Sequence, residues 1–254
     1  AGFLAIVPKI AAFVVVLRIF EIFISAGDTY VETALYIIAV VTMTMGNLMA
    51  LSQTDIKRML AFSSISHAGF VLAAILIGTT QATIGIFVYW SLFAIANLGA
   101  FGMLWINRNK DASINGYANN TLESYSGLVK KSPMLAAIFA MFMLALAGVP
   151  PFSVFWGKFY LIGAAVNADY IYLALIMALN SGIAAYYYIK PIVYMFFKEE
   201  IVVEGSARSA KVMDNSTTML KSIIGVLVIL TVASIFLVEP LIEFASYYVQ
   251  ISGY

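Results

Sequence analysis

The chain contains the segment Ala147-Gly-Val-Pro-Pro-Phe-Ser-Val-Phe-Trp-Gly-Lys-Phe-Tyr-Leu161, in which two prolines break a long apolar run and Lys158 follows them. An ammonium in the hydrocarbon core of a membrane costs about 2.5–3.5 kcal/mol on insertion scales, so a lysine there indicates a function. Interrupted backbone at this depth is tolerated only where it is buried in protein or lines a cavity. The break and the cation together predict an ion pathway through a membrane protein.

The composition is that of an integral membrane protein. Hydrophobic residues make up 63% of the chain and charged residues 11%, against about 45–50% and 25% in soluble domains. The absence of cysteine excludes disulfides and a thiolate-bound iron–sulfur cluster within this chain. His67 is the single histidine, which excludes a multi-histidine metal site or a bis-histidine haem. We therefore expect no metal and no redox centre here.

Apolar runs of membrane-spanning length predict seven transmembrane helices in one all-α membrane domain over residues 1–254. The predicted spans are 2–24, 31–51, 56–78, 82–106, 133–166, 169–197 and 219–239. The fifth is too long for one straight crossing, because about 34 residues of helix extend ~51 Å against a hydrocarbon layer of ~30 Å. Pro150 and Pro151 disfavour helix, so this span is predicted to be discontinuous, broken near 148–152. Two tightly connected short helices, one of them re-entrant, are the alternative.

The basic residues are segregated between alternate loops. One set of loops and loop edges holds Lys57, Arg58, Arg108, Lys110, Lys130, Lys131, Lys198, Arg208, Lys211 and Lys221. The opposite loops, near 25–30, 79–81 and 167–168, hold none, and neither does the sequence after 239. The positive-inside rule places the first set in the cytoplasm and the C-terminus outside. We read no signal peptide at the apolar start and expect the sequence to begin inside a larger membrane protein.

Three ionisable side chains within the spans are candidate proton carriers. Lys158 is the most deeply placed, and a lysine can gain and lose a proton whereas an arginine cannot; permanent pairing with a carboxylate or backbone carbonyls is the alternative. Lys9 follows Pro8, where a lysine reaching from a helix end toward the interface is equally compatible with the sequence. His67 titrates near neutral pH and could relay protons, or it could make a structural interhelical hydrogen bond.

Hydroxyl groups near these side chains are possible members of a proton pathway. Ser63 shares the face of His67 at i−4 on the predicted third helix. The possible pathway hydroxyls are those of Ser63, Ser64, Ser66, Tyr89 and Tyr160. The long loops at 107–132 and 198–218 contain no phosphate-binding glycine loop and no nucleophile motif, so no catalytic residue is predicted in this chain.

Three motifs resemble a known family. The run Asn47-Leu-Met-Ala-Leu-Ser-Gln-Thr-Asp-Ile-Lys-Arg-Met-Leu-Ala-Phe-Ser-Ser-Ile-Ser-His-Ala-Gly-Phe70 resembles the signature of the antiporter-like subunits of respiratory complex I. Two further segments are most similar to the subunit N type of NADH-quinone oxidoreductase. They are the broken segment around Lys158, which contains the sequence Gly-Lys-Phe-Tyr, and Ser181-Gly-Ile-Ala-Ala-Tyr-Tyr-Tyr-Ile-Lys190. The resemblance covers essentially the whole chain.

The resemblance implies the second half of an inverted-repeat antiporter-like fold, with proton translocation along a buried axis of lysines, a histidine and water. Matched by motif, Lys9 corresponds to the central connecting lysine, Lys158 to the terminal lysine and His67 to the polar position between them. The family's upstream glutamate–lysine pair has no counterpart in this sequence, so we expect the chain alone not to form a complete proton channel.

The family's role also implies what lies outside the chain. NADH, FMN, iron–sulfur clusters and quinone are expected on other subunits, with neighbouring membrane-arm subunits and the lipid bilayer as partners and no nucleic acid. The implied location is the bacterial cytoplasmic membrane. A subunit of a multi-subunit cation/proton antiporter and a structural membrane subunit without transport are the alternatives.

Overall fold

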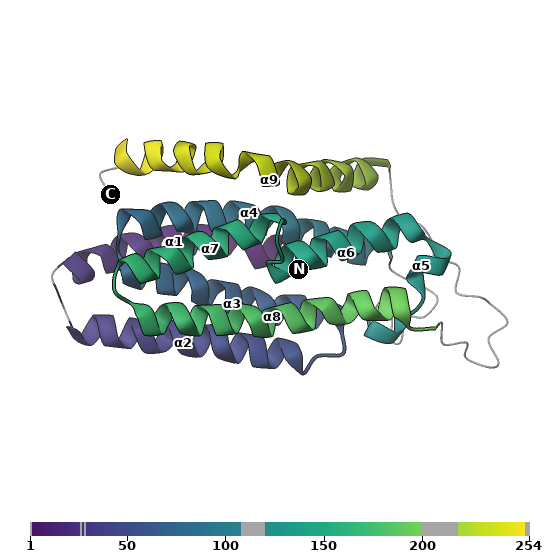
Figure 1. Ribbon diagram of the computed structural model, residues 1–254, viewed down its shortest axis with the longest axis horizontal. Helices are drawn as coiled ribbons and strands as arrows, with labels where there is room; N and C mark the ends of the chain where they lie inside the picture. Colours follow the sequence, from purple (N-terminus) through teal and green to yellow (C-terminus); the bar gives the residue numbers. More distant parts are fainter. Residues whose placement is uncertain (1, 26, 28, 108–119, 200–217, 252–254) are drawn as a thin grey trace.

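The computed structural model describes residues 2–25, 27, 29–107, 120–199 and 218–251, which form a bundle of helices lying alongside one another (Figure 1). The elements are α1 (Gly2–Ser25), α2 (Thr29–Leu51), α3 (Ile56–Ile77), α4 (Thr80–Ile106), η1 (Leu122–Tyr125), α5 (Leu128–Lys131), α6 (Pro133–Ala147), α7 (Ser153–Asn167), α8 (Ile171–Phe197) and α9 (Thr218–Ile251). Among the described residues, six helices are long and apolar enough to cross a membrane, and α6 is a shorter apolar helix. The predicted all-helical membrane fold is confirmed, while the count of seven crossings stays a prediction.

Local capping determines where the central helices begin and end. The Asp55 side chain accepts a hydrogen bond from the Arg58 amide at 2.8 Å and starts α3. Gly78 ends α3 in the left-handed conformation at φ 63°, and the Thr79 hydroxyl then accepts from the Ala82 amide at 3.2 Å to start α4. These caps satisfy backbone groups that helix ends leave unpaired. As a result, α3 and α4 are joined by a very short turn.

The two ends of the bundle differ in charge. At one end, backbone hydrogen bonds join the turn after α2 to the start of η1, with Ile56 N to Asn120 O and Leu122 N to Thr54 O both at 2.9 Å. The helix ends that meet here in Figure 1 carry basic residues: Lys57 and Arg58 at the start of α3, Lys130 and Lys131 in α5, Lys198 directly after α8, and Lys221 in the first turn of α9. The turns at 78–79 and 168–170, at the other end in Figure 1, contain no lysine or arginine. Arg108, Lys110, Arg208 and Lys211 lie outside the described residues.

The predicted break divides the fifth apolar run into α6 and α7. Helix α6 ends at Ala147 and α7 begins at Ser153, and the chain between them turns in the middle of the bundle (Figure 1). Gly148 closes α6 in the left-handed conformation at φ 77°, and its amide bonds to the Ala145 carbonyl at 3.1 Å. Two half-helices therefore occupy the place of one crossing.

Close packing of small residues holds the central helices together. Helix α2 packs along α3, α4 packs on α7 and α9, and α6 packs on α8. A Cβ added to Gly69 of α3 would lie 2.5 Å from the Met43 amide nitrogen of α2, so only glycine permits this approach. Interfaces of this kind are common in membranes, where close backbone packing replaces the hydrophobic effect between helices.

The last helix is longer than the sequence predicted. The expected span ended at 239, just before Pro240, whereas α9 continues to Ile251. A proline removes one helical hydrogen bond, but Ala245 and Val249 lie one turn apart beyond it and are only 7% and 2% exposed. Burial of this face keeps the helix continuous through the proline. The other helix ends lie within two residues of the predicted spans, the usual variation in assigning such ends.

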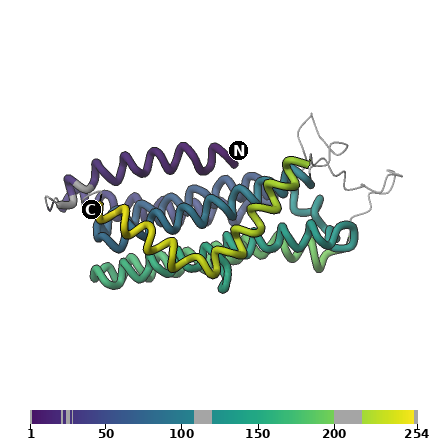
Figure 2. The backbone as a smooth tube through the Cα atoms, turned by 90° about the horizontal axis from the view of Figure 1, so that it is seen from above, coloured from purple at the N-terminus to yellow at the C-terminus, as the bar shows by residue number. Residues whose placement is uncertain are grey.

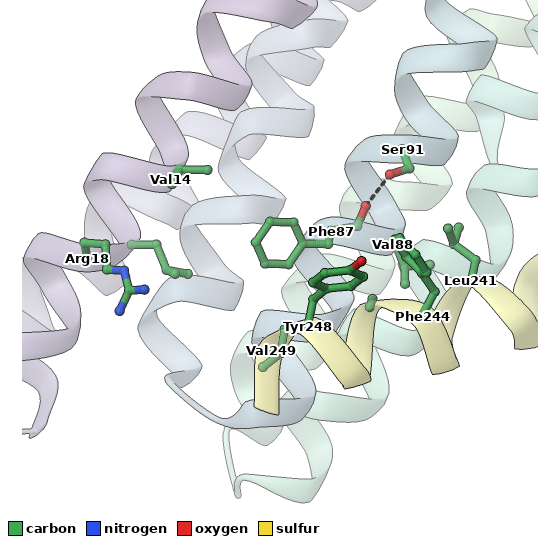
Figure 3. A pocket seen from close by; sticks show the side chains of 11 residues that line it. Val14, Arg18, Phe87, Val88, Ser91, Leu241, Phe244, Tyr248 and Val249 are labelled. Atoms are coloured by element: carbon green, nitrogen blue, oxygen red, sulfur yellow. Dashed lines mark hydrogen bonds between the residues drawn. The ribbon is translucent and has the colours of Figure 1, made fainter. Parts of the chain in front are cut away.

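An apolar groove of about 460 Å³ lies between α1, α4 and α9. Helix α9 crosses the other helices obliquely (Figure 2), and the side of α9 beyond Pro240 forms one wall of the groove. Figure 3 shows the rings of Phe87, Phe244 and Tyr248 beside it, with Arg18 at its α1 side. None of the candidate proton carriers lines this groove, so it is separate from the candidate functional site.

Candidate functional site

Lys158 lies in the interior beside the helix break. Its side chain is only 3% exposed, and Nζ donates a hydrogen bond to the Ala147 carbonyl at 3.1 Å. Ala147 is the last residue of α6, where helix carbonyls lack intrahelical partners and the helix dipole is negative. Nζ also lies 5.7 Å from the centre of the Phe70 ring, within the range of a cation–π interaction. The break thus supplies the acceptor that a buried ammonium requires.

Gly148 makes room for the lysine. A Cβ at this position would lie 3.2 Å from both Cδ and Nζ of Lys158. The residue also has φ 77°, in the left-handed region that L-residues with a side chain rarely adopt. Both the backbone conformation and the position of Lys158 therefore depend on glycine here.

His67 is held between two tyrosine hydroxyls. Its Nδ1 is hydrogen-bonded to the hydroxyl of Tyr89 on α4, and its Nε2 lies 3.1 Å from the hydroxyl of Tyr188 on α8. The imidazole is 2% exposed and packs on the Phe93 ring with 4.2 Å between the ring centres. The backbone of Tyr89 packs against Gly157, the residue before Lys158. The imidazole therefore connects α8 to α4, and α4 in turn packs on α7, the half-helix that carries Lys158.

Lys9 is bound to the helix that carries His67. Its Nζ donates to the Ser64 carbonyl at 2.9 Å and to the Ser64 hydroxyl at 2.8 Å. Lys9 is half-buried, and its partner Ser64 lies three residues before His67 on α3. The structure thus gathers the three predicted side chains around α3.

The predicted hydroxyls divide into two groups. Tyr89 bonds to His67, and Ser64 accepts from Lys9 while its own hydroxyl donates to the Ala61 carbonyl. Ser63 donates to the Leu60 carbonyl of its own helix at 2.8 Å. Among the described residues, Ser66 and Tyr160 make no side-chain hydrogen bond, so these two hydroxyls are not joined to the other three.

A buried amide cluster between α2 and α8 was not predicted. Asn47 Nδ2 donates to the Asn180 carbonyl and to Asn180 Oδ1, both at 2.9 Å, and Asn47 Oδ1 accepts from the Tyr187 hydroxyl at 3.0 Å. Asn180 Nδ2 donates to the Ile176 carbonyl at 3.0 Å and to the Thr44 hydroxyl at 3.3 Å. The available signal was one asparagine in each apolar helix, because an unpaired amide is costly in such surroundings.

Metal ligation has no support in the part of the chain that the structure describes. There, no group of three or more histidine, cysteine, aspartate or glutamate side chains is arranged to hold a metal ion. The chemistry available to the site is proton exchange by lysine, imidazole and phenol groups.

A family model matches residues 1–184, and its description is NADH:quinone oxidoreductase/Mrp antiporter, transmembrane. The chain is 53% identical over its whole length to NADH-quinone oxidoreductase subunit N of Sulfurimonas denitrificans, covering 50% of that protein. It is 49% identical to the subunit N of a Sulfurovum species, again over 100% of this chain and 50% of the relative. The chain thus spans about half the length of these curated relatives.

Solved structures show the same helix arrangement. A chain of respiratory complex I from Thermus thermophilus with bound aureothin is similar with a TM-score of 0.67 and 26% identity, over 83% of this chain and 45% of that one. A chain of the Mrp complex from a Dietzia species has a TM-score of 0.76 over 94% of this chain and 50% of its own length. At 20% identity, the second likeness concerns the fold alone.

Proposed function

The chain belongs to the NADH:quinone oxidoreductase/Mrp antiporter transmembrane family, and from this we propose that it is part of a proton-translocating membrane-arm subunit of an NADH:quinone oxidoreductase. The observation that carries the proposal is the group of Lys9, His67 and Lys158 in the interior of an apolar helix bundle. Intramembrane ionisable groups facing a bundle interior mark ion pathways and proton relays. The extended match to subunit N relatives favours the oxidoreductase over other members of the family.

Lys158 is the proposed terminal carrier of the axis. Its ammonium is stabilised by the Ala147 carbonyl and the Phe70 ring, and neither group is an anion that would hold the proton permanently. Loss of the proton leaves a neutral amine in an apolar environment, which avoids the cost of burying a charge. The same side chain can therefore hold a proton at one stage and release it at another.

Electrostatic coupling links the proposed carriers. A charge arriving from a neighbouring subunit shifts the proton affinity of Lys9, and the proton moves through His67, hydroxyls and water to Lys158. Two unit charges about 10 Å apart interact by about 1.7 kcal/mol at an effective dielectric constant of 20. That energy exceeds the 1.36 kcal/mol of one pKa unit, so each transfer alters the next site.

Buried polar atoms indicate where water supports this path. Both amide atoms of Asn97 and the Ser153 hydroxyl are buried without a hydrogen-bond partner among the described residues. Such groups in proteins are usually satisfied by ordered water. Ser153 opens α7, the half-helix that carries Lys158, so water at the break would lie on the same half-helix as the proposed carrier.

The rest of the enzyme is assigned to other subunits. Electron transfer from NADH to quinone, with FMN and iron–sulfur clusters, takes place outside this chain, whose partners are neighbouring membrane-arm subunits and the bilayer. The membrane is the bacterial cytoplasmic membrane. The basic end of the bundle faces the cytoplasm, which places the C-terminus outside.

The test replaces Lys158 in the assembled oxidoreductase and measures NADH-driven proton uptake by sealed vesicles. Lys158→Ala should reduce pumping by about tenfold or more, as expected for loss of a proton-transfer group. Lys158→Arg should be equally defective, because arginine keeps the charge and cannot release a proton. Lys57→Ala, the same change at an exposed lysine of α3, is the matched control and should pump normally.

Normal pumping by an assembled Lys158→Ala complex would contradict the proposal and favour a purely structural membrane subunit. Normal pumping by Lys158→Arg would show that the charge, and not proton exchange, is what matters. Sodium flux without NADH dependence in reconstituted protein would favour a cation/proton antiporter, which the family description also includes.

A further inference from the structure

The orientation of the His67 ring depends on how α8 is held. The imidazole is bonded at Nδ1 to the Tyr89 hydroxyl of α4 and at Nε2, over 3.1 Å, to the Tyr188 hydroxyl of α8. The χ2 torsion of a histidine is broad and roughly two-fold, so the partners of the ring nitrogens determine where each nitrogen points. Tyr188 is 121 positions from His67 in the sequence. A movement of α8 along or about its axis would therefore displace the partner of Nε2.

Close backbone contacts fix α2 against α3 at the level of His67. A Cβ added to Gly46 of α2 would lie 2.6 Å from the amide nitrogen of Ser66, the residue before His67. The second contact of this kind, at Gly69, lies about one turn further along α3. Backbones this close cannot slide past one another. Asn47, the residue after Gly46, therefore has a fixed position relative to His67.

Asn47 binds α8 at two points. Its Nδ2 donates to the main-chain carbonyl of Asn180, and its Oδ1 accepts from the Tyr187 hydroxyl, which belongs to a residue seven positions further along α8. Side chains on a helix point back toward its N-terminus, so the Tyr187 phenol extends toward the level of Asn180. The carbonyl moves only with the backbone, so this bond limits translation of α8. The bond to the phenol limits rotation of α8 about its axis.

The position of Tyr188 follows from that of Tyr187. Successive residues of an α-helix are separated by about 100° around its axis, so Tyr187 can meet α2 while Tyr188 meets α3. The two phenol rings also contact each other, with 4.6 Å between their centres, and both side chains are fully buried. The three helices thus form a closed set of contacts: glycine packing joins α3 to α2, Asn47 joins α2 to α8, and Tyr188 joins α8 back to His67.

We propose that Asn47, together with Asn180, is a positioning residue of the candidate functional site, and that its bonds to α8 hold the Tyr188 hydroxyl on His67 Nε2. Resting on the proposed function, the consequence is that loss of Asn47 slows proton transfer at His67 by releasing one side of the imidazole. A cluster that only joined α2 to α8 would contribute to the free energy of unfolding and leave the hydrogen bonds of His67 unchanged. The two roles therefore differ in what the imidazole reports.

The experiment is ¹⁵N NMR of the imidazole ring in the assembled complex. The spectrum of His67 is isolated by subtracting that of His67→Gln, with ring-¹⁵N histidine in every sample. Tyr188→Phe removes the partner of Nε2 and defines the resonance of a ring that lacks it. Asn47→Leu should move the Nε2 resonance from the wild-type position toward that of Tyr188→Phe. A wild-type resonance in an assembled Asn47→Leu complex overturns the proposal.

Two further variants test the route from Asn47 to the ring. Tyr187→Phe removes one hydroxyl and keeps the bond between Asn47 and Asn180, so it is the milder change. It should move the Nε2 resonance in the same direction, and it decides the question if Asn47→Leu does not assemble. Asn47→Leu combined with Tyr188→Phe should give the spectrum of Tyr188→Phe alone, because residues that act through one contact are not additive. An unmoved resonance in Tyr187→Phe, or an additional shift in the double variant, overturns the route through Tyr188.

Tyr170→Phe is the matched control. It removes another hydrogen bond between α2 and the start of α8, that of the Tyr170 hydroxyl to Glu32, and leaves the amide cluster intact. The Nε2 resonance should stay at its wild-type position. A shift in this variant would show that any loosening of α8 displaces Tyr188, and the specific role of Asn47 would be wrong.

Proton pumping measures the functional consequence. Tyr188→Phe and Asn47→Leu should each lower the rate of NADH-driven pumping by about fivefold, the factor expected from one hydrogen bond, and the double variant should be no slower than the slower single variant. Normal pumping in the two single variants would overturn the consequence for proton transfer.

The two proposals can fail separately. The position of Tyr188 is measured from the spectrum whether or not the complex pumps protons, so normal pumping by Lys158→Ala would end the proposed function and leave the positioning role of Asn47 standing. An unmoved Nε2 resonance in Asn47→Leu would end the positioning role and leave the proton path through Lys158 intact.

Discussion

The helix break around Lys158 and the amide cluster between α2 and α8 are both buried and polar, yet they are bonded to very different extents. The ammonium of Lys158 has three protons to donate, and among the described residues it bonds only to the Ala147 carbonyl. The Asn47 amide makes three hydrogen bonds, and Asn180 Nδ2 donates two more. The saturated cluster holds two helices together, whereas the sparse bonding of Lys158 is what the proposed proton carrier requires.

The largest difference should appear in stability. Asn47→Leu removes the acceptor of Tyr187 and the donor to Asn180, and each buried group left unpaired costs about 1–3 kcal/mol, so we expect a loss of about 3 kcal/mol. Lys158→Leu should cause no loss, because it removes a buried cation held by one carbonyl. Denaturant unfolding of the purified full-length subunit in detergent measures both. Equal losses of unfolding free energy in the two variants would show that the helix break and the amide cluster do not differ in their contribution to stability.

A smaller effect is expected where the break itself is changed. Gly148→Ala places a Cβ at φ 77° and 3.2 Å from Lys158 Nζ, with a conformational cost of about 1–2 kcal/mol. The change should also displace the ammonium from the Ala147 carbonyl and slow proton pumping. Gly163→Ala in α7, where a Cβ would meet no atom within 4 Å, is the matched control and should be neutral or slightly stabilising. A Gly148→Ala variant as stable and active as this control would show that the break does not position Lys158.

The smallest effect concerns the end of the bundle away from both regions. The Tyr170 hydroxyl donates to Glu32 and ties the turn before α8 to α2; burial, and then the hydrogen bond and charge of Glu32, raises the pKa of Tyr170 to about 12. Tyr170→Phe should cost about 1 kcal/mol, the worth of one hydrogen bond. The bond needs the neutral phenol, so its contribution is complete below pH 10 and is lost as the pH rises through about 12.

Thermal unfolding of the wild type and Tyr170→Phe, followed from pH 8 upward, measures this contribution. The difference between them should narrow at high pH. Tyr172→Phe, a change at a neighbouring side chain that is 80% exposed, should have no effect at any pH. If the difference in thermal stability between the wild type and Tyr170→Phe does not vary with pH, the stabilisation by Tyr170 does not depend on its phenol proton.

Much of the fold could be predicted because its signals are local. Apolar runs of sufficient length located the helices, and Pro150 with Pro151 located the break. The last helix extends beyond the predicted span of 219–239, and the sequence does not reveal that Ala245 and Val249 in this extension are buried. Lys158 and His67 were recognised as candidates because a charge or an imidazole is conspicuous in an apolar helix.

The partners of these residues could not be predicted. Nothing near Lys9 indicates that it bonds to Ser64, which is 55 positions away, and Asn47 and Asn180 are 133 positions apart. Tyr188 was one of three adjacent tyrosines, and only the packing of α8 on α3 shows that its hydroxyl meets His67. A tyrosine-rich, apolar sequence does not distinguish one hydroxyl from the next.

The sequence by itself determined that the chain is a membrane protein, where its helices lie and where one of them breaks, and it indicated which side chains are candidate proton carriers. Only the tertiary structure decided which helix faces meet, and therefore that a carbonyl at the break receives Lys158 and that two tyrosines hold His67. The physical reason is that lipid is as apolar as the protein interior. Hydrophobic periodicity, which orients the helices of soluble proteins, is weak here, and the orientation follows from close packing and from the few polar groups that must find one another.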